Sequence, residues 1–152
     1  MKTILGPALL ALLMSIPAGL ADDTAKVDLK IKEDLERLQG AWQMTKGVRG
    51  GQEAPKEVVE ESRLIFKDDT FSFENSREKT SAKIKLDASK SPKQLDADVT
   101  DGNNKGEKRL AIYEVEGDNL KLCWTRRGDR PAKFESKDGQ DALYMELKRA
   151  KK

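Results

Sequence analysis

The chain has 152 residues, 29 Lys and Arg against 27 Asp and Glu, a net charge of +2, no His and one Cys. Basic and acidic residues are interleaved and aromatic residues are few, which argues against a nucleic-acid partner because such proteins carry a basic stripe or patch. The missing histidine excludes Ser-His-Asp and Cys-His catalysis within the chain and, with a single cysteine, argues against a zinc site. We therefore expect no enzyme, no cofactor and no metal.

Residues 1–21 have the layout of a secretory signal peptide. Lys2 gives a positive start, Ala8–Met14 is an apolar run, and Gly19 and Ala21 are small residues before the expected cleavage site. The apolar run is shorter than the roughly 20 residues of a membrane span. We expect an exported protein, periplasmic or extracellular, with no membrane span after cleavage; a retained N-terminal anchor is the alternative.

The sequence predicts one domain after the signal peptide. Residues 22–29 are expected to form a flexible leader, residues 30–149 the folded domain, and residues 150–152 a basic tail. A domain of this length supports a single hydrophobic core. Its one cysteine leaves no internal disulfide, so burial and strand pairing must stabilise the fold.

A short helix is expected at the start of the domain. Ile31, Leu35 and Leu38 recur at helical spacing, and Gly40 follows as a stop signal. The spacing predicts about two helical turns. Further along, the sequence KEVVEESR is expected to form another helical turn, whereas GVRGGQEAP before it reads as a flexible loop.

From Trp42 onward, apolar and polar residues alternate in eight short runs, most of them separated by turn sequences such as KDDT and EGDN. The alternating apolar positions are Trp42 and Met44; Leu64 and Phe66; Phe71 and Phe73; Ala82, Ile84 and Leu86; Leu95, Ala97 and Val99; Leu110 and Ile112 opposite Ala111 and Tyr113; Leu120, Leu122 and Trp124; and Leu143, Met145 and Leu147. The stretch RRGDRPAKFESKDGQD, residues 126–141, is expected to be irregular.

These runs predict an all-β domain. Alternation buries one face of each strand, as in antiparallel barrels and sandwiches. Short connections favour a meander, and a meander with one apolar side closes most simply on itself, which removes exposed edges. We therefore predict an eight-stranded antiparallel up-and-down barrel with a short N-terminal helix.

The sequence Gly40-Ala41-Trp42, between the helix and the first strand, resembles the motif at the start of the lipocalin barrel. In that group the tryptophan plugs one end of the barrel, and a basic residue after the last strand packs over it. The resemblance assigns barrel closure to Gly40, Trp42 and Arg149, and a guanidinium over an indole contributes about 0.5–2 kcal/mol. The chain departs from lipocalins in lacking a clear Thr-Asp-Tyr loop, a disulfide and a C-terminal helix.

A closer resemblance covers the chain from about Leu35 to Arg149. The motifs LQGAWQMTKG, RLIFKDDTFSF, YEVEGDNLKLCW, RPAKFES and ELKR, in this order, are similar to those of a secreted, lipocalin-like domain family of planctomycete bacteria whose function is unknown. The resemblance implies a barrel and export. It implies no catalytic residue.

Three residue groups invite a functional interpretation. Cys123 is a reactive thiol or, as we favour, a small residue on a packed strand. The acidic residues around GNNKGE miss the register of a calcium loop, and Asp96 and Asp98 are instead expected to face Lys83 and Lys85 across two strands. The glycines of GVRGGQEAP lack the strand-loop-helix context of a phosphate site, so we expect them to let this connection fold over one end of the barrel, and a lid role for it is a hypothesis.

Two functions remain open. The first is binding of a small apolar ligand inside the barrel, beneath the GVRGGQEAP loop, by burial worth about 25 cal/mol per Å². The predicted ligand-binding residues are Phe66, Phe73, Ile84, Leu122, Trp124 and Met145. The second is a non-catalytic protein-interaction or structural module of the periplasm or cell surface, acting through residues 126–141. An apolar cavity of ~300 Å³ or more favours the first, and a fully packed interior favours the second.

Overall fold

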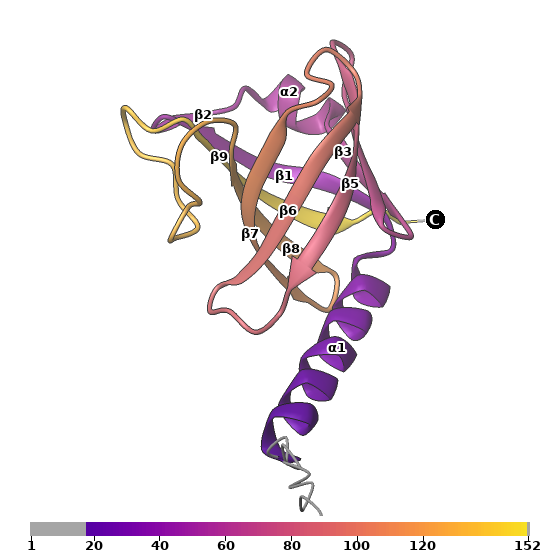
Figure 1. The fold of residues 1–152 in the computed structure, drawn as a ribbon. Coiled ribbons are helices and arrows are strands. Elements are labelled where there is room, and N and C mark those ends of the chain that lie inside the picture. The colour runs from indigo at the N-terminus through magenta and orange to yellow at the C-terminus, as the bar shows by residue number, and fades with distance from the viewer. Residues whose placement is uncertain (1–17, 152) are drawn as a thin grey trace, which may run out of the picture.

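The computed structural model describes residues 18–151 (Figure 1). Most of the predicted signal peptide, residues 1–17, and the final residue of the basic tail lie outside the described residues. Between residues 18 and 151, no helix has both the length and the apolar character needed to cross a lipid bilayer.

The chain forms two helices and nine strands within the described residues. In order, these are α1 (Ala18–Leu38), β1 (Gly40–Arg49), β2 (Gln52–Glu53), α2 (Lys56–Glu61), β3 (Arg63–Lys67), β4 (Thr70–Glu74), β5 (Lys79–Asp87), β6 (Lys93–Asp101), β7 (Lys108–Glu116), β8 (Asn119–Thr125) and β9 (Ala142–Arg149). The strand boundaries coincide with the alternating runs, and α2 lies where a helical turn was expected.

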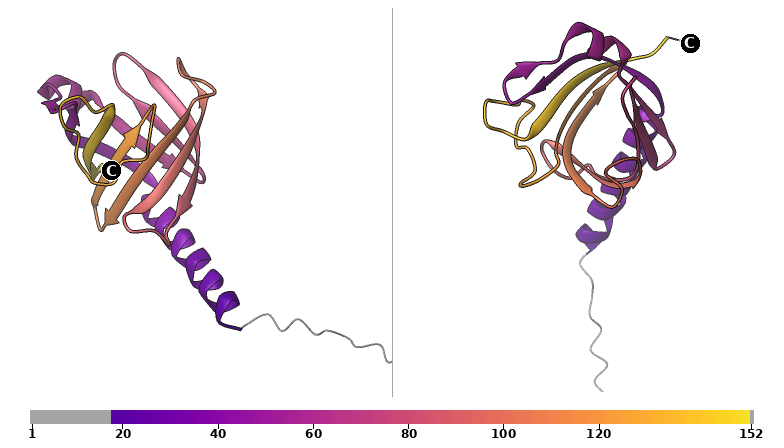
Figure 2. Two further views of the ribbon diagram at one scale, coloured as in Figure 1. Left: turned by 60° about the vertical axis from the view of Figure 1, so that its left-hand side comes forward. Right: turned by 90° about the horizontal axis from the view of Figure 1, so that it is seen from above.

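Eight of the strands, β1 and β3 to β9, form a closed antiparallel barrel, which confirms the predicted fold class. From β3 to β9 each strand pairs with the next in the chain, and β1 pairs with both β3 and β9 to complete the ring seen from above in Figure 2. The two-residue strand β2 pairs with the last residues of β1. Closure pairs each barrel strand on both sides, except along part of β1, where the pairing with β3 ends at Gln43.

Strand register follows the expected charge pattern. Lys83 is paired with Asp98 and Lys85 with Asp96 across β5 and β6, as predicted. The closest cation to the Asp96 carboxylate is nevertheless Arg130, whose Nη2 lies 2.5 Å from Oδ1. Register is therefore predictable from alternation, whereas the ion-pair partner comes from a segment distant in sequence.

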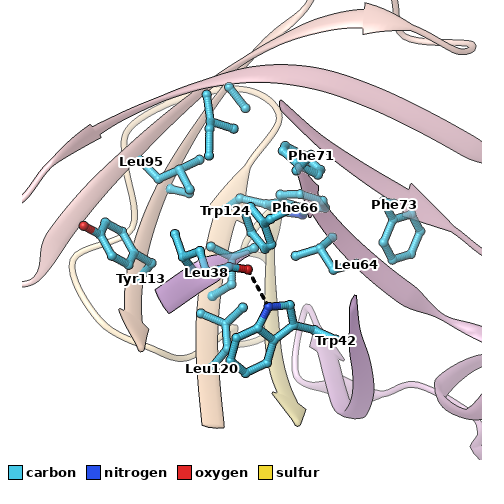
Figure 3. Packing of buried hydrophobic residues seen from close by; sticks show 14 of the residues in the cluster. Leu38, Trp42, Leu64, Phe66, Phe71, Phe73, Leu95, Tyr113, Leu120 and Trp124 are labelled. Atoms are coloured by element: carbon cyan, nitrogen blue, oxygen red, sulfur yellow. Dashed lines mark hydrogen bonds between the residues drawn. The ribbon is translucent and has the colours of Figure 1, made fainter. Parts of the chain in front are cut away.

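The barrel interior is filled by one cluster of buried side chains (Figure 3). Trp42 lies at its base and donates a hydrogen bond of 2.8 Å from its indole nitrogen to the Leu38 carbonyl. Higher in the barrel the ring of Trp124 packs against Phe71 and Phe73, with centroids 5.9 and 6.3 Å away. Contacts between aromatic rings stabilise beyond simple area burial.

Helix α1 is longer than the two turns expected, because it includes residues 22–29, which the sequence analysis treated as leader. That segment lacks apolar periodicity but also lacks Gly and Pro, and Ala, Lys and Leu favour helix on their own. Only the C-terminal part of α1 packs on the barrel, through Ile31, Leu35 and Leu38. The rest projects away (Figures 1 and 2), and Leu29 there is 57% exposed.

The sequence GVRGGQEAP is not a loop throughout, which corrects the prediction. Strand β1 continues to Arg49 because Val48 and Arg49 pair with β9 on one side and with β2 on the other. Gly50 and Gly51 make the turn, with φ of 56° and 78°, a backbone region that favours glycine.

Residues 126–141 form no strand, as expected, and cover the outer face of the barrel. Beneath them lies a second, smaller cluster of buried residues, Ile112, Cys123, Ala142 and Tyr144, against which Phe134 packs. On β7 the inward residues are therefore Ala111 and Tyr113, and Ile112 faces outward under this segment.

Candidate functional site

Gly40, Trp42 and Arg149 lie together at the α1 end of the barrel. Trp42 and Arg149 are partners in the β1–β9 register, and the guanidinium carbon of Arg149 lies 4.4 Å from the indole centroid. Arg149 also donates from Nη1 to the Gln39 carbonyl at 2.8 Å and from Nη2 to the Arg37 carbonyl at 2.7 Å. The guanidinium thus joins the last strand to the end of α1.

Gly40 is required there by its backbone. Its φ is +105°, a region that L side chains rarely adopt, whereas an added Cβ would lie an ordinary 3.6 Å from Nη1 of Arg149. Conformation, rather than crowding, excludes other residues at this corner.

Asp34 attaches α1 to the same end and was missed by the sequence analysis. Its side chain is 2% exposed, accepts a hydrogen bond of 2.8 Å from the Tyr113 hydroxyl, and forms an ion pair of 2.6 Å with Lys93 Nζ. Burial, followed by the hydrogen bond to Asp34, raises the pKa of Tyr113. The sequence position of Asp34 could have indicated its burial, because Asp34 lies on the apolar face of the helix defined by Ile31 and Leu38.

The six predicted ligand-binding residues come together in the interior, all of them in the main buried cluster: Phe66, Phe73, Ile84, Leu122, Trp124 and Met145. Four surface pockets described for residues 18–151 lie elsewhere on the barrel, and none of these six side chains lines them. Their side chains therefore fill space that a ligand would have to share.

One pocket does reach the core. It has a volume of about 550 Å³ and lies between β1 and α2, with Met44 of the buried cluster in its lining together with Gly47, Ala54 and Val59. A Cβ on Gly47 would lie 3.2 Å from the Met44 sulfur and 3.3 Å from the Ala54 Cβ, so the glycine permits this close packing. Four charged residues surround the pocket: Lys46, Glu53, Lys56 and Glu60.

The opposite end from α1, which we call the distal end, is formed by the connections 75–78, 102–107 and 126–141. Arg109 lies there at an inward position of β7 and is 5% exposed. Its guanidinium carbon lies 4.8 Å from the Trp124 ring centroid. The sequence analysis missed it, although alternation along β7 puts residue 109 on the same face as Ala111 and Tyr113.

A second pocket, of about 440 Å³, lies outside the barrel and is lined by residues 125–142. Charges of both signs surround it, including Arg127, Arg130, Lys133, Asp129, Glu135 and Asp141. Its segment is anchored by Arg130, which donates to the Ala111 carbonyl at 2.8 Å, and by Ser136, which accepts from the Gly50 amide at 2.8 Å. The Gly50-Gly51 turn, for which a lid role was a hypothesis, is therefore bonded to this outer segment.

Cys123 lies under residues 126–141, with its thiol donating to the Glu135 carbonyl at 3.5 Å. Burial raises the pKa of this thiol to about 11. Since the thiolate is the nucleophilic form, the group is protonated and unreactive near neutral pH.

The acidic residues around GNNKGE do not converge. Asp96 is bound by Arg130, and the nearest cation to Glu107 is Arg126, at 3.8 Å from Nε to Oε2. In residues 18–151, no three His, Cys, Asp or Glu side chains are grouped so as to hold a metal ion.

With this geometry established, the chain was compared with known proteins. It matches no family model, no curated protein and no solved structure.

Proposed function

We propose that this is an exported, non-catalytic binding module, of the planctomycete lipocalin-like kind, that receives a small apolar ligand in the barrel. The observation that carries the proposal is the pocket of about 550 Å³ between β1 and α2, which reaches the core at Met44. Its volume lies within the roughly 300–1,000 Å³ typical of small-molecule sites.

The pairing between neighbouring barrel strands is shortest beside this pocket. The pairing of β1 with β3 extends only from Gly40 to Gln43, and beyond it α2 covers the edge of β1. None of the six residues of α2 is buried. Segments with few buried contacts open at low free energy, so α2 is the element best suited to move when a ligand enters.

The predicted residues would then supply the apolar contacts. Movement of α2 would expose Met44 and, beyond it, the buried cluster that includes Met145 and Leu122, which are partners across β8 and β9. Each Å² of apolar ligand surface removed from water would contribute about 25 cal/mol.

Binding can be tested with the neutral fluorophore N-phenyl-1-naphthylamine. The protein is expected to enhance its fluorescence saturably, and Ala54→Trp, which fills the pocket, should weaken binding at least tenfold. Ala132→Trp, which fills the outer pocket instead, is the matched control and should leave binding unchanged. Equal binding by both variants would place the ligand elsewhere, and no binding by the wild-type protein would refute the proposed function.

Export has its own test. The N-terminal sequence of the protein recovered outside the cytoplasm should begin at Asp22. A retained residue 1 would refute cleavage after Ala21.

The second candidate is an interaction or structural module that acts through residues 126–141. The pocket of about 440 Å³ and its mixed charges favour this function. A protein partner cross-linked through the amine of Lys133, and lost in Ala132→Trp but not in Ala54→Trp, would support it over ligand binding.

A further inference from the structure

The two ends of the barrel each carry an arginine stacked on a tryptophan, and the two pairs differ in hydrogen bonding. Arg149 over Trp42 donates to two carbonyls and to the Asp118 carboxylate. Arg109 over Trp124 makes the stack alone: among the described residues no group accepts a hydrogen bond from its guanidinium, and Nε is buried without a partner.

Such a group is unusual because buried polar atoms are nearly always hydrogen-bonded. A guanidinium carries five N–H donors in a planar fork that fits a carboxylate. Burial is the main cause that lowers the pKa of Arg109, followed by the charge of Arg126. The barrel therefore holds a largely buried cation at its distal end, and the Nε of this cation has no hydrogen-bond partner among the described residues.

No carboxylate of the described residues forms an ion pair with Arg109. Two guanidinium groups and two carboxylates act on it electrostatically from further away: Arg126, Arg49, Glu107 and Glu78. Neither carboxylate lies within ion-pair distance of Arg109, and Glu107 Oε2 is itself buried without a hydrogen bond.

Apolar residues lie directly beside the guanidinium. Arg109 is the register partner of Ala97, and Trp124 is the partner of Ala111, both alanines being fully buried. Phe73 packs edge-on against the Trp124 ring, with the two ring centroids 6.3 Å apart. A cation is thus placed at the boundary between the charged distal end and the aromatic interior.

We propose that Arg109 binds the carboxylate of an amphipathic monocarboxylate whose apolar tail lies against Trp124 and Phe73. This inference rests on the proposed function and specifies its ligand class. The carboxylate would accept hydrogen bonds from the guanidinium and neutralise its charge, while the tail would lie at the aromatic end of the core.

The experiment compares two ligands that share a tail. Dodecanoate and dodecanol are titrated into the purified protein by isothermal calorimetry, with Trp fluorescence as a second readout. Because hydrogen bonds to a charged group are worth about 1.5–3 kcal/mol, dodecanoate should bind roughly 10- to 100-fold more tightly than dodecanol. Arg109→Gln should abolish this preference while dodecanol affinity stays within about threefold, and Arg109→Lys should retain part of it because the positive charge remains.

Arg63→Gln is the matched control, since it removes an exposed positive charge from β3 near the same end of the barrel. It should leave the preference unchanged. Equal affinity for the two ligands, or a preference that survives Arg109→Gln, overturns the carboxylate site but leaves the proposed function standing. If neither ligand binds the wild-type protein, and N-phenyl-1-naphthylamine does not bind either, both proposals fail. The wild-type comparison decides the question even if Arg109→Gln does not fold.

Discussion

Replacing each stacked arginine by methionine should change stability unequally. Arg149→Met removes the stack on Trp42 and the hydrogen bonds to the Gln39 and Arg37 carbonyls. Arg109→Met removes the stack on Trp124 but also removes a buried donor that has no partner. Methionine keeps the length and apolar stem of the side chain, so both variants report mainly on the guanidinium.

The magnitudes follow from these contacts. The stack contributes about 0.5–2 kcal/mol in either case. The two carbonyl bonds of Arg149 add about 1 kcal/mol each, at the low end for charged donors because the side chain is 34% exposed and water can replace them. We expect Arg149→Met to lose roughly 2.5–4 kcal/mol of unfolding free energy, whereas relief of an unsatisfied buried donor, worth about 1–3 kcal/mol, offsets the loss in Arg109→Met.

Urea unfolding followed by circular dichroism measures the unfolding free energies of both variants, and thermal unfolding measures their Tm values. Arg63→Met is the exposed control. The Tm of Arg149→Met should fall by roughly 8–20 °C, since 1 kcal/mol corresponds to about 3–5 °C for a domain of this size. The Tm of Arg109→Met should stay near that of the wild type or rise. A loss in Arg109→Met equal to that in Arg149→Met would refute the reasoning, because Arg109 would then stabilise the fold rather than await an anion.

Three further predictions concern single positions. Asp34→Asn should cost about 1–3 kcal/mol by removing the buried carboxylate that binds Lys93 and Tyr113, while Asp28→Asn on the exposed side of α1 should change urea stability by under about 0.5 kcal/mol. Because the pKa of Cys123 is raised in the folded protein, the unfolded chain loses the thiol proton at a lower pH than the folded one. The unfolding free energy should therefore fall by up to about 3 kcal/mol as pH rises from 9.0 to about 11. A pH series with Cys123→Ala should lack this fall. Gly40→Ala should cost about 1–3 kcal/mol through its φ of +105°, and calorimetry should find a smaller loss for Gly117→Ala, where φ is +58° and no atom is near.

The strands were predictable because alternation is a local property. Strand β5 shows this well: Ala82, Ile84 and Leu86 face the core, with Lys83 and Lys85 outside. The same rule applied to β7 would have placed Arg109 inside, but a charged residue is ordinarily expected on the solvent face. The polar start of α1 was missed for the opposite reason, since propensity without apolar periodicity gives a weak signal.

The order of the elements, the antiparallel barrel and the two faces of its strands are contained in the sequence itself, because the period of apolar residues dictates which side chains can share a core. Tertiary structure alone decided the partners that lie far apart in the chain: Arg149 with the end of α1, Asp34 with Lys93, and Arg109 with no acceptor for its Nε among residues 18–151. The alternation of apolar and polar residues along the chain indicates which side chains are buried. Hydrogen bonds and ion pairs depend on distances between residues that are set only when the barrel has closed.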